Sequence, residues 1–208
     1  MTLSRYALIG VALLLVVVVY ITFFTGGGDT VAVSPEAYRQ QVLAERQKKD
    51  DFCRTSPDSP IPDKAHFTGL AYYDPNLTYR VTARLDPFAD KTQKLIVRLS
   101  DGSEDVYEKY AHVVFSLADT PCRLLVLKHE GTLSILYKDA TSGGETYGGG
   151  RYIDLDPETI VENRVVVDFN AGYNPYCAYA PEYACPLPPP ENTLPIAVKA
   201  GEKYAAHE

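Results

Sequence analysis

The segment at 146–151 (TYGGGR) holds the residues best suited to contact a small ligand. Its three consecutive glycines leave backbone N–H groups accessible, and Arg151 adds a forked cation, so an anion could bind there. A nucleotide P-loop is excluded, because no Gly-Lys-Ser or Gly-Lys-Thr follows the glycines. The interpretation we favour is a tight strand connection in which Arg151 pairs with Asp139, Glu145 or Asp168.

The polar residues Asp168 and Asn170 alternate along an extended segment and therefore share one face of a strand. With Asn174, Glu191 and Glu202 they could form a polar cluster, in which a buried carboxylate pair could perform acid–base chemistry. We favour a structural role, since Asp and Asn side chains also cap turns. The alternative is a ligand site whose candidate residues are Tyr147, Arg151, Asp168, Asn170 and Asn174.

The residues that covalent or metal-dependent catalysis needs do not fall into a known motif. The four histidines are scattered, and His129-Glu130 lacks the second histidine of the metalloprotease motif. Asp154 and Asp156 share a strand face, but we favour two solvated acids at a strand end over a cation site. No Gly-x-Ser-x-Gly elbow is present. The sequence therefore predicts no catalytic residue, no bound metal and no cofactor, and it favours a protein without enzymatic activity.

Tyrosine is frequent, with 16 residues, and tryptophan is absent. Six tyrosines crowd two short segments, at Tyr147, Tyr152, Tyr173, Tyr176, Tyr179 and Tyr183. Tyrosine offers a large contact area, a polar tip and a small loss of side-chain entropy, which suits protein interfaces. We predict an interface at Tyr173, Tyr176, Tyr179 and Tyr183; packing of some of these rings in the core is the alternative.

The charge balance limits the classes of partner. The chain carries 20 Lys and Arg against 27 Asp and Glu, a net charge of −7. An acidic domain without a basic block binds nucleic acid poorly, because phosphate contacts need clustered Lys and Arg. The same balance argues against adhesion to anionic lipid.

Residues 6–24 (YALIGVALLLVVVVYITFF) form an uncharged run of 19 residues. As a helix the run would be about 28 Å long, close to the hydrocarbon core of a bilayer of about 30 Å. A cleaved signal peptide is the alternative, but its apolar region is shorter and a small-x-small site follows it. Arg5 precedes the run and the next basic residue is Arg39, so we expect a cytoplasmic N-terminus and a periplasmic or extracellular domain.

Outside the cytoplasm, the even number of cysteines suggests disulfide bonds, and four cysteines permit three pairings. We predict a Cys177–Cys185 bridge, which closes a short loop, and we consider Cys53–Cys122 as the second. The C-x7-C spacing, without a nearby histidine or a second close pair, does not support a structural zinc site.

Three regions position these residues: an anchor and glycine joint at 1–28, a juxtamembrane helix and proline-rich loop at 29–64, and a β domain at 65–208. Ser34-Pro35-Glu36 is typical of a helix start and predicts a helix to about Phe52, whose ERQKKDD segment is mostly a solvated face. Short β patterns between turn residues predict an antiparallel sandwich or partly open barrel. HEGT predicts a hairpin. The expected strands lie at 66–73, 77–85, 93–99, 105–116, 123–129, 132–137, 151–155, 164–169 and 194–199.

Several segments resemble one family of bacterial and archaeal proteins catalogued as a domain of unknown function. They include TYGGGRY, DFN…YNPYCAY, CPLPPPEN and AGEK, and the resemblance covers roughly residues 36–203. Many members look like secreted, lipoprotein or membrane-anchored proteins, so the resemblance implies an extracytoplasmic β-rich domain and no known reaction. Cys53 departs from the family, which usually has an aromatic residue there, and Cys122 is also particular to this chain. Two additional cysteines together favour a bridge between them.

Two functional hypotheses follow. The leading one is a non-catalytic, membrane-anchored domain that binds a partner protein or stabilises a membrane complex. It depends on the apolar run at 6–24, the absence of a catalytic constellation and the tyrosine-rich segment at 169–192. The alternative is a small-ligand-binding protein or hydrolase-like enzyme that uses the TYGGGR and DFN segments.

Overall fold

The computed structural model describes residues 34–204. The chain divides into two units, Met1–Ser34 and Pro35–Glu208, and the fold described below belongs to the second. The predicted membrane segment at 6–24 lies outside the described residues. Within 34–204, no helix is both long enough and apolar enough to span a bilayer.

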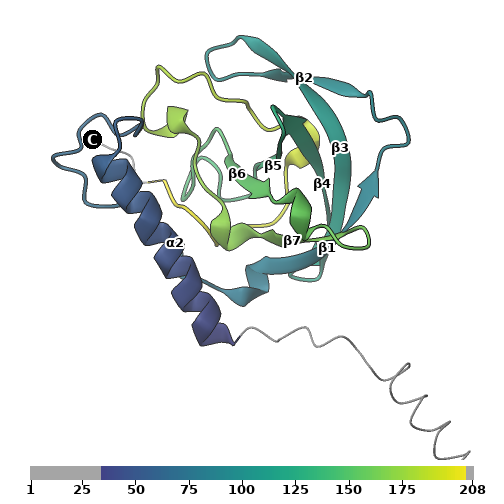
Figure 1. Ribbon diagram of the computed structural model, residues 1–208, viewed down its shortest axis with the longest axis horizontal. Coiled ribbons are helices and arrows are strands. Elements are labelled where there is room, and N and C mark those ends of the chain that lie inside the picture. Colours follow the sequence, from purple (N-terminus) through teal and green to yellow (C-terminus); the bar gives the residue numbers. More distant parts are fainter. Residues whose placement is uncertain (1–33, 205–208) are drawn as a thin grey trace, which may run out of the picture. The chain divides into compact units, whose positions relative to one another are not determined.

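Helix α2 (Pro35–Thr55) is the α-helix of the described region, and it begins where the sequence predicts. Proline at the first helical position sacrifices no hydrogen bond, and Glu36 in the first turn interacts favourably with the helix dipole. The helix ends three residues beyond the predicted Phe52. Figure 1 shows α2 lying along one side of the curled sheet.

The prediction of a mostly solvated ERQKKDD face is wrong for part of this segment. Arg46 donates from Nη1 to the carbonyl of Tyr73 at 2.8 Å, and Asp50 Oδ1 accepts from the backbone N–H of Leu70 at 3.1 Å. Lys49 forms an ion pair with Glu202 of the β domain. Because these contacts are polar, the hydrophobic pattern of the helix gives no sign of them.

The sheet is antiparallel throughout and curls into a half-barrel, which agrees better with the predicted partly open barrel than with a sandwich (Figure 1). Its strand order is β6-β5-β4-β3-β1-β7, and β2 pairs with β3. The strands are β1 (Arg80–Pro87), β2 (Lys94–Arg98), β3 (Glu104–Leu117), β4 (Thr120–His129), β5 (Thr132–Tyr137), β6 (Arg151–Leu155) and β7 (Arg164–Asp168).

The HEGT hairpin is confirmed. Glu130 and Gly131 join β4 to β5 with φ angles of 48° and 89°, the two positive values that suit a tight turn between right-twisted strands. The turn between β3 and β4 uses Ala118 and Asp119, also with positive φ, so both strands extend farther toward it than predicted.

Two of the nine expected strands, at 66–73 and 194–199, do not form. The first makes one isolated bridge, Tyr72 with Glu202. The second makes two backbone hydrogen bonds with the residues after β5, from Leu194 N to Lys138 O at 2.8 Å and from Ala140 N to Ile196 O at 3.1 Å. Gly69, with φ of +121°, interrupts the first segment. In the second, Val198 is buried by packing against the sheet rather than by ladder pairing, and so is Ala200 just beyond the segment.

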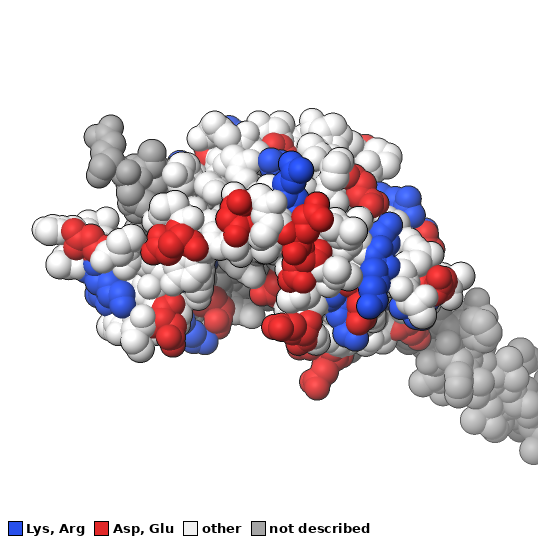
Figure 2. Space-filling view, turned by 90° about the horizontal axis from the view of Figure 1, so that it is seen from above, with Lys and Arg blue, Asp and Glu red and all other residues white. Residues whose placement is uncertain are grey.

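The core fills the concave side of the curled sheet. Its main cluster combines alternate residues of six strands with Leu194, Val198 and Ala200 from the C-terminal segment. The fully buried ring of Phe169 lies edge-on to Tyr137, with centroids 5.3 Å apart. On the face seen in Figure 2, acidic side chains form several separate groups with basic side chains among them.

Candidate functional site

Arg151, the predicted cation of an anion site, is completely buried. Its guanidinium donates to Asp139 Oδ2 at 2.8 Å and to three carbonyls of the C-terminal segment. Those carbonyls belong to Val198 at 2.9 Å, Glu202 at 3.2 Å and Ala200. Arg151 therefore ties the C-terminal segment to β6, and Asp139 is its partner, as the favoured interpretation of the sequence expects.

The glycines of the same segment allow close packing rather than an open cradle. Gly150 has φ of +96°, and a Cβ there would lie 2.5 Å from Pro188 Cγ and 2.7 Å from the carbonyl of Tyr137. A Cβ on Gly149 would lie 2.3 Å from the Tyr147 ring. The space next to Gly149 and Gly150 is therefore occupied by other atoms of the protein.

Asp168 and Asn170 hold other parts of the chain in place. The Tyr38 hydroxyl of α2 lies 2.9 and 2.8 Å from the two Asp168 oxygens, and the Asn170 backbone N–H donates to Asp168 Oδ1 at 2.9 Å. Asn170 is buried, and its side chain makes two hydrogen bonds with the backbone of Asn76: Nδ2 donates to the Asn76 carbonyl at 2.8 Å, and Oδ1 accepts from the Asn76 N–H at 2.9 Å. These contacts agree with turn-capping, the favoured interpretation.

Glu202 lies in a buried polar cluster with Asn174. Its side chain is 1% exposed and pairs with Lys49 Nζ of α2 at 2.8 Å. Asn174 donates to it from Nδ2 at 3.0 Å and from its backbone N–H at 3.2 Å, and the Tyr179 hydroxyl donates to Oε1. Of the polar cluster predicted from sequence, the structure brings together Asn174 and Glu202. It places Glu191 elsewhere, 2.9 Å from His112 Nε2.

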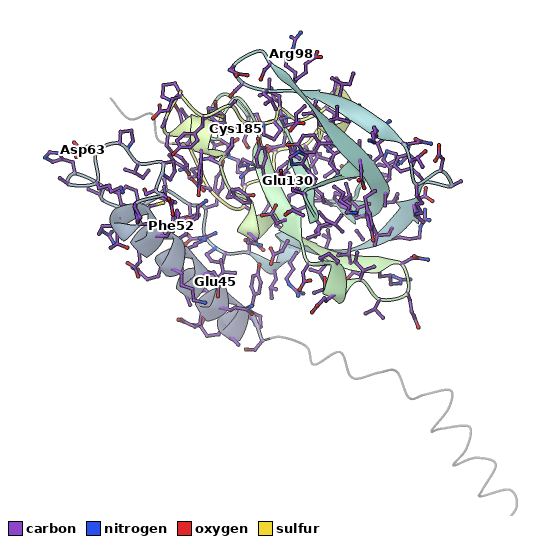
Figure 3. The ribbon with its side chains drawn as sticks, turned by 45° about the horizontal axis from the view of Figure 1, so that its top comes forward. Glu45, Phe52, Asp63, Arg98, Glu130 and Cys185 are labelled. Atoms are coloured by element: carbon purple, nitrogen blue, oxygen red, sulfur yellow. The ribbon has the colours of Figure 1, made fainter. Side chains whose placement is uncertain are left out.

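A pocket of about 330 Å³ lies beside this cluster, between the second half of α2 and the tyrosine-rich segment. Three of the four predicted interface tyrosines line it. Its full lining is Lys49, Phe52, Cys53, Pro60, Ala171, Tyr173, Tyr176 and Tyr179. Figure 3 labels Phe52 on α2 and Cys185 in the tyrosine-rich segment.

The pocket has aromatic walls and one ammonium group. Lys49 Nζ lies 4.8 Å from the centroid of the Tyr173 ring, which gives a cation–π contact in addition to its ion pair with Glu202. Phe52 and Tyr176 are each 38% exposed. Tyr183, 36% exposed, packs its ring against Tyr176 with centroids 5.3 Å apart, so the aromatic surface continues beyond the pocket.

A model of the protein family of unknown function DUF1684 matches residues 65–203. The chain belongs to this family. The solution NMR structure of an uncharacterised protein from Haloarcula marismortui is similar, with 33% sequence identity and a TM-score of 0.65 over 83% of this chain and 97% of that chain. No curated protein matches the sequence.

The four cysteines of this DUF1684 protein are free thiols in the structure. Cys177 and Cys185 are adjacent, since the backbone N–H of Cys177 donates to Cys185 Sγ at 3.2 Å, and their bridge stays a prediction. The Cys53–Cys122 bridge is not formed: Cys122 packs in the sheet core, whereas Cys53 lines the pocket under α2. Within residues 34–204, no three His, Cys, Asp or Glu side chains are grouped to hold a metal ion.

Sequence reasoning missed the pairing of Lys49 with Glu202 and five pocket residues, Lys49, Phe52, Cys53, Pro60 and Ala171. The side of the pocket at 49–60 is separated along the chain by more than a hundred residues from the side at 171–179 and from Glu202. A buried acid near the C-terminus and a lysine on a charged helix carry no local pattern that relates one to the other.

Replacing Glu202 with glutamine in this DUF1684 protein should remove one pH dependence of its stability. Burial raises the pKa of the Glu202 carboxyl, whereas the unfolded chain keeps a value of about 4.3. Between these values the native state holds a proton that the unfolded state has lost. The stability contribution is therefore complete below about pH 4 and is lost as pH rises through the native pKa. Urea denaturation should show the wild-type advantage over Glu202→Gln shrinking as pH is raised.

The matched control is Glu145→Gln, because the exposed Glu145 has its pKa lowered by a hydrogen bond from Lys199. Its wild-type advantage should grow with pH, the opposite sign. A wild-type advantage over Glu202→Gln that also grew with pH would mean that the Lys49 ammonium keeps the Glu202 carboxylate ionised.

Proposed function

We propose that this DUF1684 protein is a non-catalytic, membrane-anchored extracytoplasmic domain that binds a partner protein through the aromatic pocket beside α2. The observation that carries the proposal is the pocket itself, in which Tyr173, Tyr176 and Tyr179 face Phe52 of the helix. The apolar run at 6–24 and the resemblance to envelope proteins support the anchored location.

The chemistry of the pocket favours an uncharged, apolar side chain as its occupant. Among the described residues that line the pocket, Lys49 is the only ionic group, and it is already paired with Glu202, so a charged occupant would meet no unpaired opposite charge there. A volume of about 330 Å³ is at the lower end for small-molecule sites, which run from about 300 to 1,000 Å³. One bulky side chain of a partner would suit this space.

The surface around the pocket fits the anatomy of a protein interface. Phe52, Tyr176 and Tyr183 expose aromatic area next to the opening, and aromatic residues that flank a desolvated pocket are typical binding hot spots. A tether at the membrane would also raise the local concentration of any partner in the same membrane.

The rival hypothesis, a ligand site or hydrolase built on TYGGGR and DFN, has less support. Arg151 is buried against Asp139, and Asp168 and Asn170 are engaged with Tyr38 and Asn76. A ligand that approached these residues would have to displace contacts that hold the fold together.

Tyr176→Ala should weaken association with the partner about tenfold while the thermal stability stays close to wild type. Truncation of a half-exposed interfacial tyrosine costs roughly 1–2 kcal/mol of binding, because the ring makes its main contacts with the partner. The measurement is co-purification of the tagged full chain from membranes in mild detergent, with melting temperatures recorded alongside.

Ile96→Ala is the control, because Ile96 is 65% exposed on β2 and is not among the residues that line the pocket. A partner lost with Tyr176→Ala and retained with Ile96→Ala supports the proposal. A stable Tyr176→Ala/Tyr183→Ala double variant that still recovers every wild-type partner would remove this surface as the interface.

A further inference from the structure

Two thiols of unequal accessibility lie next to each other in the tyrosine-rich segment. Cys177 lies in a single 3₁₀ turn (Tyr176–Ala178) and is partly exposed, whereas Cys185 is 8% exposed. The backbone N–H of Cys177 reaches Cys185 Sγ at 3.2 Å, and the Tyr147 hydroxyl donates to Cys177 Sγ at 3.7 Å.

We propose that Cys177 and Cys185 form a redox-active pair that reduces small-molecule disulfides, with Cys177 as the attacking thiol and Cys185 as the resolving thiol. The assignment of roles follows from the geometry, because the attacking sulfur must be reachable from solvent and the resolving sulfur must lie behind it. This inference does not rest on the proposed partner binding, and because one reaction oxidises the pair, it is a stoichiometric step that is compatible with a non-catalytic domain.

Hydrogen bonding prepares Cys177 for the first step. The Cys185 thiol and the Tyr147 hydroxyl donate to its sulfur, and these bonds lower the pKa of the Cys177 thiol to about 6. The same interaction raises the pKa of Cys185, which keeps its proton until Cys177 has reacted. Since the thiolate is the nucleophile, the pair is asymmetric in reactivity as well as in exposure.

The resolving cysteine is held firmly in position. Its backbone N–H donates to Ser100 Oγ at 3.0 Å, and its carbonyl accepts from the Ser100 N–H at 2.8 Å. The neighbouring Pro186 forms a bridge with Leu99. Closure of the bond therefore needs movement mainly of the short turn that carries Cys177.

The reaction balances without a further reactant. The Cys177 thiolate attacks one sulfur of the external disulfide, forms a mixed disulfide and expels a thiolate, which takes up the proton that Cys177 released. Cys185 then loses its proton to solvent and attacks Cys177 Sγ, which expels the second thiolate, and this is protonated in turn. The protein is oxidised by two electrons, and the external disulfide is reduced to two thiols.

Cys53 and Cys122 are internal controls, because both are buried and burial raises the pKa of both thiols. They should stay unmodified while the protein is folded. After unfolding in urea, all four cysteines should react.

The test treats the reduced full chain in detergent with oxidised glutathione, traps the products with an alkylating agent and maps them by mass spectrometry. Wild type should form the Cys177–Cys185 bond and keep no glutathione. Cys185→Ser should retain one glutathione on Cys177, and Cys177→Ser should react at neither position. Near-ultraviolet circular dichroism of each variant checks that it remains folded.

The rate at which Cys177 attacks oxidised glutathione gives a second test of the proposal. At pH 6 the thiolate fraction of Cys177 exceeds that of free cysteine by about 150-fold, and lower intrinsic nucleophilicity removes about 10- to 20-fold of this. Cys177 of the wild type should therefore react with oxidised glutathione about tenfold faster than free cysteine at that pH, and Cys185→Ser should react more slowly than wild type where it loses the hydrogen bond that contributes most to the low pKa. Reaction of folded Cys177→Ser at Cys185, or folded wild type in which Cys177 stays unmodified, would overturn the proposal.

Discussion

Replacing Arg151 with alanine should lower the free energy of unfolding by about 3–5 kcal/mol. The substitution leaves Asp139 buried without its cation, and the side chains of both residues are completely inaccessible to solvent. The carbonyls of Val198, Ala200 and Glu202 would also lose a charged donor. Urea denaturation followed by circular dichroism measures the loss, which is a large part of the roughly 5–15 kcal/mol typical of a domain.

The control for this experiment is Arg84→Ala. Arg84 and Asp86 are 3.8 Å apart on the surface, with side chains 59% and 50% exposed, and exposed pairs of this kind contribute about 0–1 kcal/mol. If Arg151→Ala were as mild as Arg84→Ala, the buried ion pair would not be structural, and an anion site at TYGGGR would again be the better interpretation.

Arg151 also illustrates where sequence reasoning ends. The residue type indicated an ion pair, but three acids were candidates and only the fold selects Asp139. Glu145 pairs instead with Lys199 at 2.9 Å, and Asp168 accepts from Tyr38. The selection depends on how β6 packs against the C-terminal segment, and no local pattern encodes that packing.

Elements defined by periodicity and turn chemistry were predictable. Seven of the nine expected strands form, the Glu130-Gly131 hairpin has the required φ angles, and α2 begins at Pro35. The segment at 194–199 was wrongly expected to be a strand. Its alternation of buried and exposed residues is typical of a strand, yet its backbone makes two hydrogen bonds with residues 138–140, through Leu194 and Ile196, and the Val198 carbonyl accepts from Arg151.

Only the tyrosine side of the candidate site could be predicted from the sequence. Tyrosine clustering identified Tyr173, Tyr176 and Tyr179, because residue type alone favours interfaces. The opposite wall comes from α2, where Phe52 and Lys49 belong to a segment dominated by charge. Helix docking through ion pairs and hydrogen bonds leaves no apolar stripe, so this wall required the structure.

The Asn192 side chain replaces backbone hydrogen bonds between β4 and β5 where their ladder ends. These strands pair at Leu127 with Ser134 and at two further positions toward the hairpin, and the ladder then stops. Continued in the same register, Leu125 would lie opposite Leu136. The Asn192 amide fills this position: Nδ2 donates to Leu125 O at 2.9 Å and Leu136 O at 2.7 Å, and Oδ1 accepts from Leu125 N at 2.6 Å.

Asn192→Ala should therefore cost at least about 3 kcal/mol of folding free energy. It leaves three buried backbone groups without partners, and each buried unsatisfied group costs about 1–3 kcal/mol. The neighbouring Thr193→Ala, at an exposed position, should change stability by less than about 0.5 kcal/mol. Hydrogen exchange gives the local signature, because the Leu125 amide loses its acceptor and should exchange much faster while amides of the paired strands β1 and β7 keep their protection. Unchanged exchange at Leu125 in a folded Asn192→Ala variant would mean that β4 and β5 can close the gap themselves, with Leu125 and Leu136 forming the ladder bonds that Asn192 now replaces.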